Sequence, residues 1–355
     1  MKYLKICITL LLVIAISLSF SSFAAPVEQL KIHFIDVGQA DSILVQVTTG
    51  KYMLVDAGNN SDGKAVVDYL KKQGVKKLDY LVLTHPHEDH IGGADNIIKS
   101  FQIGKVYMPK VTTTTKTFED IVTAMKTKNL KATSPVSGSK FNLGKATITI
   151  LAPNRIKYDD FNSYSIVLKL TYGKNSFLLT GDADNTSETE ILKKKYNIKA
   201  DVLKVGHHGS ETSTSTDFLK AISPKYAVIS VGKDNDYKHP HQATMDKLKN
   251  AKIQVYRTDE NGTIICTSDG TKITFNCKPG SYKYNDGTTT TSGAIKTTPS
   301  NTTDDNRLVY YTDGGKSYHF DKDCSTLSRS KNILQGKLSD VIKLGKSDPC
   351  DKCVN

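Results

Sequence analysis

The densest group of reactive side chains is a short stretch, Thr84–Gly93, in which three imidazoles and one carboxylate lie within six positions. These donors are His85, His87, Asp89 and His90. Imidazole nitrogens and carboxylate oxygens at such close spacing form a ligand set that suits zinc and neighbouring divalent cations. The stretch therefore predicts a metal centre, and we expect Glu88 to point away from it.

Two later motifs supply further donors. Leu179–Asp182 ends an apolar run with a carboxylate, for which Asp184 is the nearest competitor. Gly206–Ser210 contains adjacent imidazoles, His207 and His208, and the residues alone leave open which one coordinates metal. A nucleophilic Ser210 is disfavoured because metal ligation would occupy the same imidazoles.

Short β-branched runs alternate with amphipathic helical stretches from Leu30 to Asn276, which indicates a layered α/β domain. The predicted strands are Lys31–Ile35, Ile43–Val47, Tyr52–Val55, Tyr80–Leu83, Ser165–Leu170, Phe177–Leu179, Val202–Val205 and Ala227–Ser230. The predicted helices are Lys64–Gln73, Ala94–Ser100, Phe118–Lys128, Ser187–Tyr196 and Gln242–Asn250. Several of the polar motifs fall where a strand ends, which is where α/β enzymes place their chemistry.

The H-x-H-x-D-H motif after a strand resembles the signature of the metallo-β-lactamase superfamily, and the resemblance extends over about Leu30–Phe275. It implies a four-layer αββα sandwich with two divalent ions, zinc or manganese. By resemblance, His85 and His87 hold one metal, Asp89 and His90 hold the other, and Asp182 bridges them. Asp56, in Val55–Gly58, looks like the family's earlier aspartate that orients the metal loop.

No histidine lies between His90 and His207, where many members of the family place a third ligand for the first metal. Asn162–Ser165 stands there instead, with weaker donors. This pattern resembles one branch, the C-terminal hydrolase domain of late-competence DNA-uptake proteins and its secreted stand-alone relatives. The resemblance includes Phe34–Ser42 and Lys238–Pro240, within which Asp36, Gln39 and Asp41 are either structural turn residues or site residues.

The resemblance implies catalytic roles for Asp89, His208 and His239. His239 follows a glycine-containing loop, so we expect it either to contact phosphate or to pack the loop. A bridged pair of cations would lower the pKa of a shared water and hold phosphoester oxygens during displacement.

The N-terminus has the pattern of an export signal. Lys2 and Lys5 precede an apolar run from Ile6 to Phe20, and Ser22–Ala24 offers small residues for cleavage, so we expect residues 1–24 to be removed and the protein to be secreted. The alternative is a membrane anchor, but the run is shorter than the ~20 residues a span requires, and we expect no transmembrane segment in the mature protein. Removing both lysines lowers the formal charge from +12 to +10. A charge of this sign fits polyanionic partners such as nucleic acid, wall polymers or anionic membranes, and equally a solvated lysine-rich surface, so the charge alone does not choose between them. If that charge gathers near the metal loop, binding should weaken steeply with salt.

The predicted hydrolase domain covers residues 28–277, a Thr/Ser-rich linker follows over 278–306, and a small module occupies 307–355. In this module His319, Cys324, Cys350 and Cys353 form a closed ligand set typical of one structural zinc. The module resembles the metal-binding module of Ada-type DNA repair proteins; the alternative is a disulfide with one free thiol. Cys266 and Cys277 stay unassigned, since a two-residue turn at Asp269-Gly270 would place Cys266 opposite Ile273.

These observations favour a secreted metal-dependent phosphodiesterase, most simply a nuclease acting on DNA or RNA. One alternative is a hydrolase of a wall choline phosphoester, or of a small ester, amide or lactam. Another is a non-catalytic DNA- or wall-binding protein whose hydrolase site is vestigial, and the intact ligand set argues against this alternative.

Overall fold

A computed structural model describes residues 28–285, 308–315, 317–319, 324, 327, 332–344, 346 and 348–349. The chain divides into two units at Thr289/Thr290, and each is described by itself. The predicted leader, the predicted cleavage site, most of the linker, Cys350 and Cys353 lie outside the described residues. Among the described residues, no helix is long and apolar enough to cross a membrane.

The first unit contains two mixed sheets. The first sheet has the order β15-β14-β1-β2-β3-β4-β5-β6, with strands Ile273–Phe275, Ile264–Ser268, Leu30–Phe34, Ile43–Val47, Lys51–Val55, Lys77–Val82, Gln102–Tyr107 and Ala132–Thr133. The second has the order β13-β12-β11-β10-β9-β8-β7, with strands Gln254–Arg257, Tyr226–Ile229, Val202–Lys204, Asn175–Leu179, Val167–Tyr172, Ala146–Ala152 and Lys140–Leu143.

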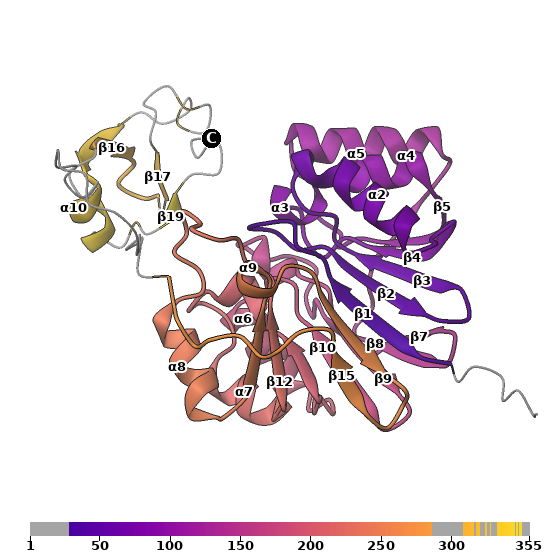
Figure 1. Cartoon of the computed structure of the whole chain (residues 1–355). Helices are drawn as coiled ribbons and strands as arrows, with labels where there is room; N and C mark the ends of the chain where they lie inside the picture. The colour runs from indigo at the N-terminus through magenta and orange to yellow at the C-terminus, as the bar shows by residue number, and fades with distance from the viewer. Residues whose placement is uncertain are drawn as a thin grey trace, which may run out of the picture. The chain divides into compact units, whose positions relative to one another are not determined.

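Helices cover the outer face of each sheet (Figure 1). Those beside the first sheet are α2 (Gly63–Lys72), α3 (Glu88–Ile91), α4 (Ala94–Ser100) and α5 (Lys116–Thr127). Those beside the second are α6 (Asn185–Lys193), α7 (Thr216–Ile222), α8 (Gln242–Asn250) and α9 (Thr258–Asn261). Short 3-10 turns are η1 (Asn60–Asp62), η2 (Asn162–Tyr164) and η3 (Gly206–Gly209).

Three apolar cores separate these layers. Side chains alternate along a strand, so in β2 Ile43 and Val45 face the core between the sheets while Leu44 faces the helices. The central core combines residues such as Phe34 and Phe177 from both sheets. The two outer cores pack helices against each sheet. The order helix, sheet, sheet, helix is the expected αββα sandwich.

The predicted helices Ala94–Ser100 and Gln242–Asn250 coincide with α4 and α8. Sequence reasoning missed α7, which is only seven residues long, and did not include β14 and β15 among the predicted strands, although it considered a turn between them. The hairpin of these two strands also corrects one expectation, because Asp269 N–H donates to the carbonyl of Lys272 and the turn is centred on Gly270 and Thr271, one position later than expected. Cys266 therefore lies opposite Phe275 rather than Ile273, and no disulfide joins Cys266 to Cys277.

Parallel pairing of neighbouring strands gathers the polar motifs. Strands β10, β11 and β12 run parallel, as do β3 and β4. Their carboxyl ends lead into Asp56, Thr84–His90, Asp182, Gly206–Gly209 and Ser230. Since parallel strands end at one edge of a sheet, all of these segments meet at one edge of the sandwich.

The second unit has a small sheet of order β18-β16-β17-β19. In that order, its strands are Leu334–Lys337, Leu308–Tyr311, Ser317–His319 and Asp348–Pro349. The helix α10 (Leu338–Lys343) lies between β18 and β19 in the chain. Its described buried apolar side chains form two clusters, one of Val309, Tyr318 and Val341 and one of Cys324 and Leu327.

Candidate metal centre

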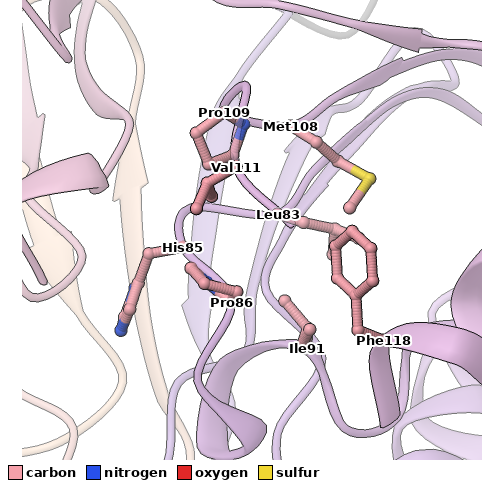
Figure 2. Close-up of a pocket in the computed structure, with 8 residues that line it drawn as sticks. All are labelled: Leu83, His85, Pro86, Ile91, Met108, Pro109, Val111 and Phe118. Carbon is pink, nitrogen blue, oxygen red and sulfur yellow. The ribbon is translucent and has the colours of Figure 1, made fainter. Parts of the chain in front are cut away.

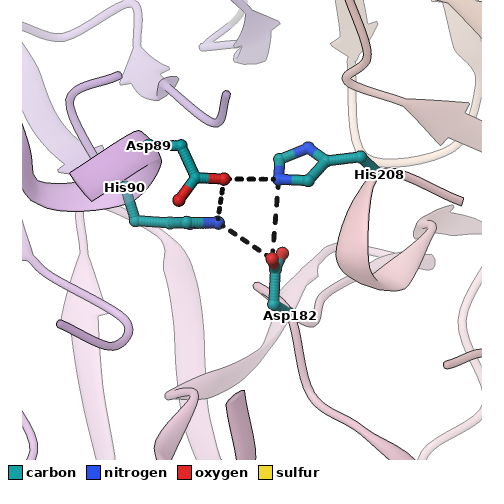
Figure 3. Close-up of side chains that lie close together, drawn as sticks. All are labelled: Asp89, His90, Asp182 and His208. Atoms are coloured by element: carbon teal, nitrogen blue, oxygen red, sulfur yellow. Dashed lines mark hydrogen bonds and ion pairs between the residues drawn. The ribbon is translucent and has the colours of Figure 1, made fainter. Parts of the chain in front are cut away.

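Four side chains from both halves of the sandwich converge on one point (Figure 3). They are Asp89, His90, Asp182 and His208, whose donor atoms all lie within 4.8 Å of one another. His90 Nε2 lies 3.1 Å from Asp182 Oδ2, and His208 Nε2 lies 3.2 Å from Asp89 Oδ2. Two imidazoles and two carboxylates around one point form a ligand set for a divalent cation.

The two imidazoles are held by hydrogen bonds on their outer nitrogens. His90 Nδ1 donates to Asp56 Oδ2 at 2.8 Å, and His208 Nδ1 donates to the carbonyl of Ser230 at 2.9 Å. Asp56 is itself fixed by the backbone N–H and the hydroxyl of Thr84, at 2.8 and 2.7 Å. These bonds leave each Nε2 atom directed at the cluster, as in metal-ligating histidines. Asp56 thus supports the metal loop from behind.

The geometry separates the two adjacent histidines that the sequence left open. His207 and His208 both have left-handed backbone, with φ of 51° and 52°, so the chain turns sharply after β11. The side chain of His208 is 1% exposed and lies within the cluster, whereas that of His207 is 25% exposed, with Nε2 3.8 Å from Asp182 Oδ2. His208 therefore completes the four-donor set, and His207 faces the open side.

His85 and His87 form a second pair of donors, with His85 Nε2 3.0 Å from His87 Nδ1. Figure 2 shows His85 at the edge of a small apolar cavity lined by residues such as Leu83, Ile91 and Phe118. Ser165 Oγ lies 3.4 Å from His85 Nδ1 and accepts from the Asp182 N–H. The segment that replaces the third histidine thus packs directly on this pair, and the Oδ1 atom of Asn162 is buried without a hydrogen-bond partner in the described part of the chain.

Charges within the cluster shift the pKa values strongly. Burial lowers the pKa of His208, but the Asp182 and Asp89 carboxylates outweigh this and raise it to about 10. His90 behaves in the same way, with a pKa raised well above its ordinary value. Burial and the neighbouring His90 instead hold the pKa of His85 well below its usual range. Without a cation, the carboxylates therefore hold protons on the two imidazoles that face them.

A buried ion pair lies behind the cluster, and sequence reasoning did not single out its lysine. Lys204 Nζ lies 2.6 Å from Asp41 Oδ2, and both side chains are essentially inaccessible, at 0% and 1%. Asp41 Oδ2 is 3.9 Å from His90 Nδ1, and its Oδ1 is 3.8 Å from His208 Nδ1. A lysine in the otherwise apolar run Val202–Val205 was the available sign of such a pair.

His239 lies beside the two adjacent histidines, with ring centroids 5.5 Å from His207 and 6.4 Å from His208. Gln39 accepts from Gly232 N–H through Oε1 and donates through Nε2 to His239 Nδ1. Burial, then His207 and His208, lower the pKa of His239 to about 2. The ring is therefore neutral with its proton on Nε2, and Gln39 has a positioning role.

The remaining sequence candidates lie apart from the cluster. Glu88 accepts from the backbone N–H of Asn60, and the hydroxyl of Ser210 contacts Thr212 rather than a histidine. In the second unit, His319 and Cys324 are both buried. Their expected partners Cys350 and Cys353 lie outside the described residues, so the zinc set stays a prediction.

Comparison with known proteins identifies the fold. Residues 35–233 match the metallo-beta-lactamase superfamily. The chain belongs to this superfamily. The matched region contains Asp56, the Thr84–His90 stretch, Asp182 and His208, so the superfamily domain carries the whole four-donor cluster.

Two curated relatives of this superfamily domain have competence names. The chain is 34% identical over 251 residues to "ComE operon protein 3" of Bacillus subtilis, covering 66% of this chain and 32% of the relative. It is 33% identical over 256 residues to "Competence protein ComA" of Neisseria gonorrhoeae, covering 71% of this chain and 34% of the relative. The chain thus spans about a third of the length of these relatives. Among solved structures, the metallo-beta-lactamase fold protein YhfI of Bacillus subtilis matches with 16% identity and a TM-score of 0.46, over 68% of this chain and 100% of that one.

Proposed function

We propose that this metal-dependent hydrolase is an exported phosphodiesterase that cleaves DNA or RNA with a metal-activated water. The observation that carries the proposal is the buried set of Asp89, His90, Asp182 and His208, which converges from both sheets. Such a set stabilises a cation and has little structural use without one, since four close ionisable groups are costly to bury.

The residues fit a divalent cation. Asp182 Oδ1 is buried without a hydrogen-bond partner among the described residues, and a bound cation would satisfy it. His85 and His87 offer a second pair of nitrogens beside the same cluster. When bound, zinc or manganese ions would supply an activated water and offset the charge of phosphate oxygens.

The chain's own groups have distinct proposed roles. Asp89, His90, Asp182 and His208 would hold one cation, and His85 and His87 would hold another. Ser165, in the segment Asn162–Ser165 that replaces a third histidine, lies beside His85. Asp56 and the Ser230 carbonyl fix the ligand tautomers. His239 presents its Nε2–H as a neutral hydrogen-bond donor, which suits an anionic phosphate oxygen without acting as a base.

Two features favour nucleic acid over other esters. The relatives named for competence share this domain at about a third identity, and competence concerns DNA. The formal charge, +10 once the proposed leader is removed, also fits a polyanionic substrate. The sequence pattern at residues 1–24 and the small C-terminal unit fit an exported protein that associates with polyanions or the cell wall.

The test is an incubation of the purified protein with labelled DNA and RNA, with zinc or manganese added in turn. We expect metal-dependent cleavage with little sequence preference, and its loss in Asp182→Ala and His87→Ala variants that remain folded. The matched control is Asp184→Ala, because Asp184 is the neighbouring carboxylate and lies outside the four-donor set. Cleavage no greater than that of Asp182→Ala would contradict the proposal. Turnover of a choline phosphoester instead would select the wall-ester alternative.

A further inference from the structure

Exposed apolar side chains gather on two loops of the first unit. The first is the β8–β9 loop, residues 153–166, with Ile156 80% and Phe161 37% exposed. The second is the β12–α8 loop, residues 230–241, with Tyr237 47% exposed. Large apolar side chains left in water close to a reactive centre indicate a contact surface for a ligand.

Both aromatic rings contact histidines of the metal centre. Phe161 meets His87 edge to face, with ring centroids 5.7 Å apart. Tyr237 stacks on His239 at 5.7 Å with an interplanar angle of 22°. One continuous series of ring contacts joins the two aromatic residues through His87, His85, His90, His208 and His239. Phe161 and Tyr237 are therefore the two end members of this series of ring contacts, and each contacts a histidine at or beside the metal centre.

The same loops carry no net formal charge. In the β8–β9 loop, Arg155 and Lys157 are balanced by Asp159 and Asp160. In the β12–α8 loop, Lys233 and Lys238 are balanced by Asp234 and Asp236. The positive charge expected near the metal loop is therefore not found on the two loops beside it, and attraction of phosphates does not explain why aromatic rings are exposed there.

We propose that Phe161 and Tyr237 are stacking platforms for the bases on either side of the cleaved phosphate, and that the substrate is single-stranded nucleic acid. This inference rests on the proposed function, because the metal centre would hold the phosphate and each ring contacts a histidine at or beside that centre. A base stacks on an aromatic side chain only when its face is free, as in a single strand. In a duplex the faces are occupied by neighbouring base pairs. Exposed aromatic rings that contact His87 and His239, on loops with no net charge, suit that substrate.

The experiment compares binding of a labelled oligothymidine with that of a duplex of equal length, both with cleavage-resistant phosphorothioate links, to the metal-loaded protein. Stacking contributes about 1–3 kcal/mol per base, so we expect Phe161→Leu and Tyr237→Leu each to weaken single-strand binding roughly tenfold. The double variant should bind roughly a hundredfold more weakly. Duplex binding should be weaker in the unmodified protein and should not change in the variants.

Two controls separate stacking from other roles. Tyr237→Phe keeps the ring and should bind like the unmodified protein, as should Val136→Ala, which trims an exposed side chain on neither loop. Metal content is measured alongside, since Phe161 contacts His87. Duplex binding as tight as single-strand binding, or leucine variants that keep single-strand binding, would overturn the inference. Absence of metal-dependent cleavage of ordinary strands would overturn only the proposed hydrolysis, because the binding comparison requires no turnover.

Discussion

At the scale of single residues, the metal centre depends as much on supporting groups as on ligands. Asp56 has a positive φ of 59° and is fully buried, and it accepts three hydrogen bonds, two from Thr84 and one from His90. Burial raises the pKa of Asp56, and the adjacent His90 opposes that rise. The carboxylate therefore gains its stabilisation from the same imidazole whose orientation it fixes.

We predict that Asp56→Asn lowers metal affinity by about 10–100-fold, because it weakens the bond that orients His90 while leaving all ligands present. Titration with a competing chelator measures this. Glu88→Gln is the matched control, since Glu88 lies within the ligand stretch but bonds the Asn60 backbone. Equal affinities for Asp56→Asn and the unmodified protein would contradict the role of Asp56.

The buried pair of Lys204 and Asp41 gives a second prediction at this scale. Lys204→Met should destabilise the metal-free protein by about 3–5 kcal/mol, because it leaves the Asp41 carboxylate buried and unpaired. The double variant Lys204→Met/Asp41→Asn should recover part of that loss. Denaturant unfolding of the three proteins measures both effects, and a double variant less stable than Lys204→Met would argue against the pairing.

At the scale of elements, the centre is an assembly of strand ends and the tight loops that follow them. The turn at η3 brings His208 inward by placing two consecutive residues in left-handed backbone. The β12–α8 loop approaches the β1–β2 connection so closely that a Cβ on Gly232 would lie 2.6 Å from Gln39 N. Packing between loops from the two sheets thus sets the position of His239 through Gln39.

We predict that Gly232→Ala lowers kcat/KM about tenfold while metal content stays unchanged, because the added methyl group pushes Gln39 from His239 and a misplaced contact is costly in rate. Gly314→Ala serves as the control, since an added Cβ there meets no atom within 4 Å. Loss of metal from Gly232→Ala would show that the substitution disturbs the ligands themselves.

At the scale of the whole molecule, the two halves of the sandwich each contribute half of the four-donor set. Asp89 and His90 follow the first sheet's β4, while Asp182 and His208 follow β10 and β11 of the second. The charges of the two carboxylates raise the pKa values of the two imidazoles. A pKa of His208 raised to about 10 means that this imidazole is protonated at neutral pH when no cation is bound.

The affinity of the four-donor set for a cation should therefore rise with pH, because a cation there displaces protons from His90 and His208, whose pKa values are raised. We predict a rise of about tenfold per pH unit for each proton displaced, which levels off above the pKa of about 10. Zinc titrations at several pH values, with proton release followed in buffers of different ionisation enthalpy, measure this. Affinity independent of pH would show that His208 binds no proton in the metal-free protein.

The second unit carries the last prediction. We expect one tightly bound zinc to be lost when Cys350 and Cys353 are both changed to Ser, because a closed set of His319 and three cysteines stabilises a unit with a small core. Metal analysis is carried out on the Asp182→Ala variant, which lacks a ligand of the hydrolase site, so that the zinc of the second unit is measured by itself. A disulfide between Cys350 and Cys353 in the native protein would exclude the site.

The sequence alone determined the layered α/β class and the residues with metal chemistry, because both are local patterns. His85, His87, Asp89 and His90 stand within six positions, and strand and helix periods are visible in neighbouring residues. The family resemblance added the αββα arrangement, which the match over residues 35–233 confirmed.

Only the tertiary structure decided which donors meet. His207 and His208 are identical in type and adjacent, so nothing local separates them; the left-handed turn after β11 directs one inward and the other outward. Asp41 and Lys204 are distant in sequence, and so are Phe161 and Tyr237, whose rings are linked only through the histidines between them. Such relations arise when two sheets pack with their strand ends at one edge, because long-range packing, not residue order, sets distances between chain segments.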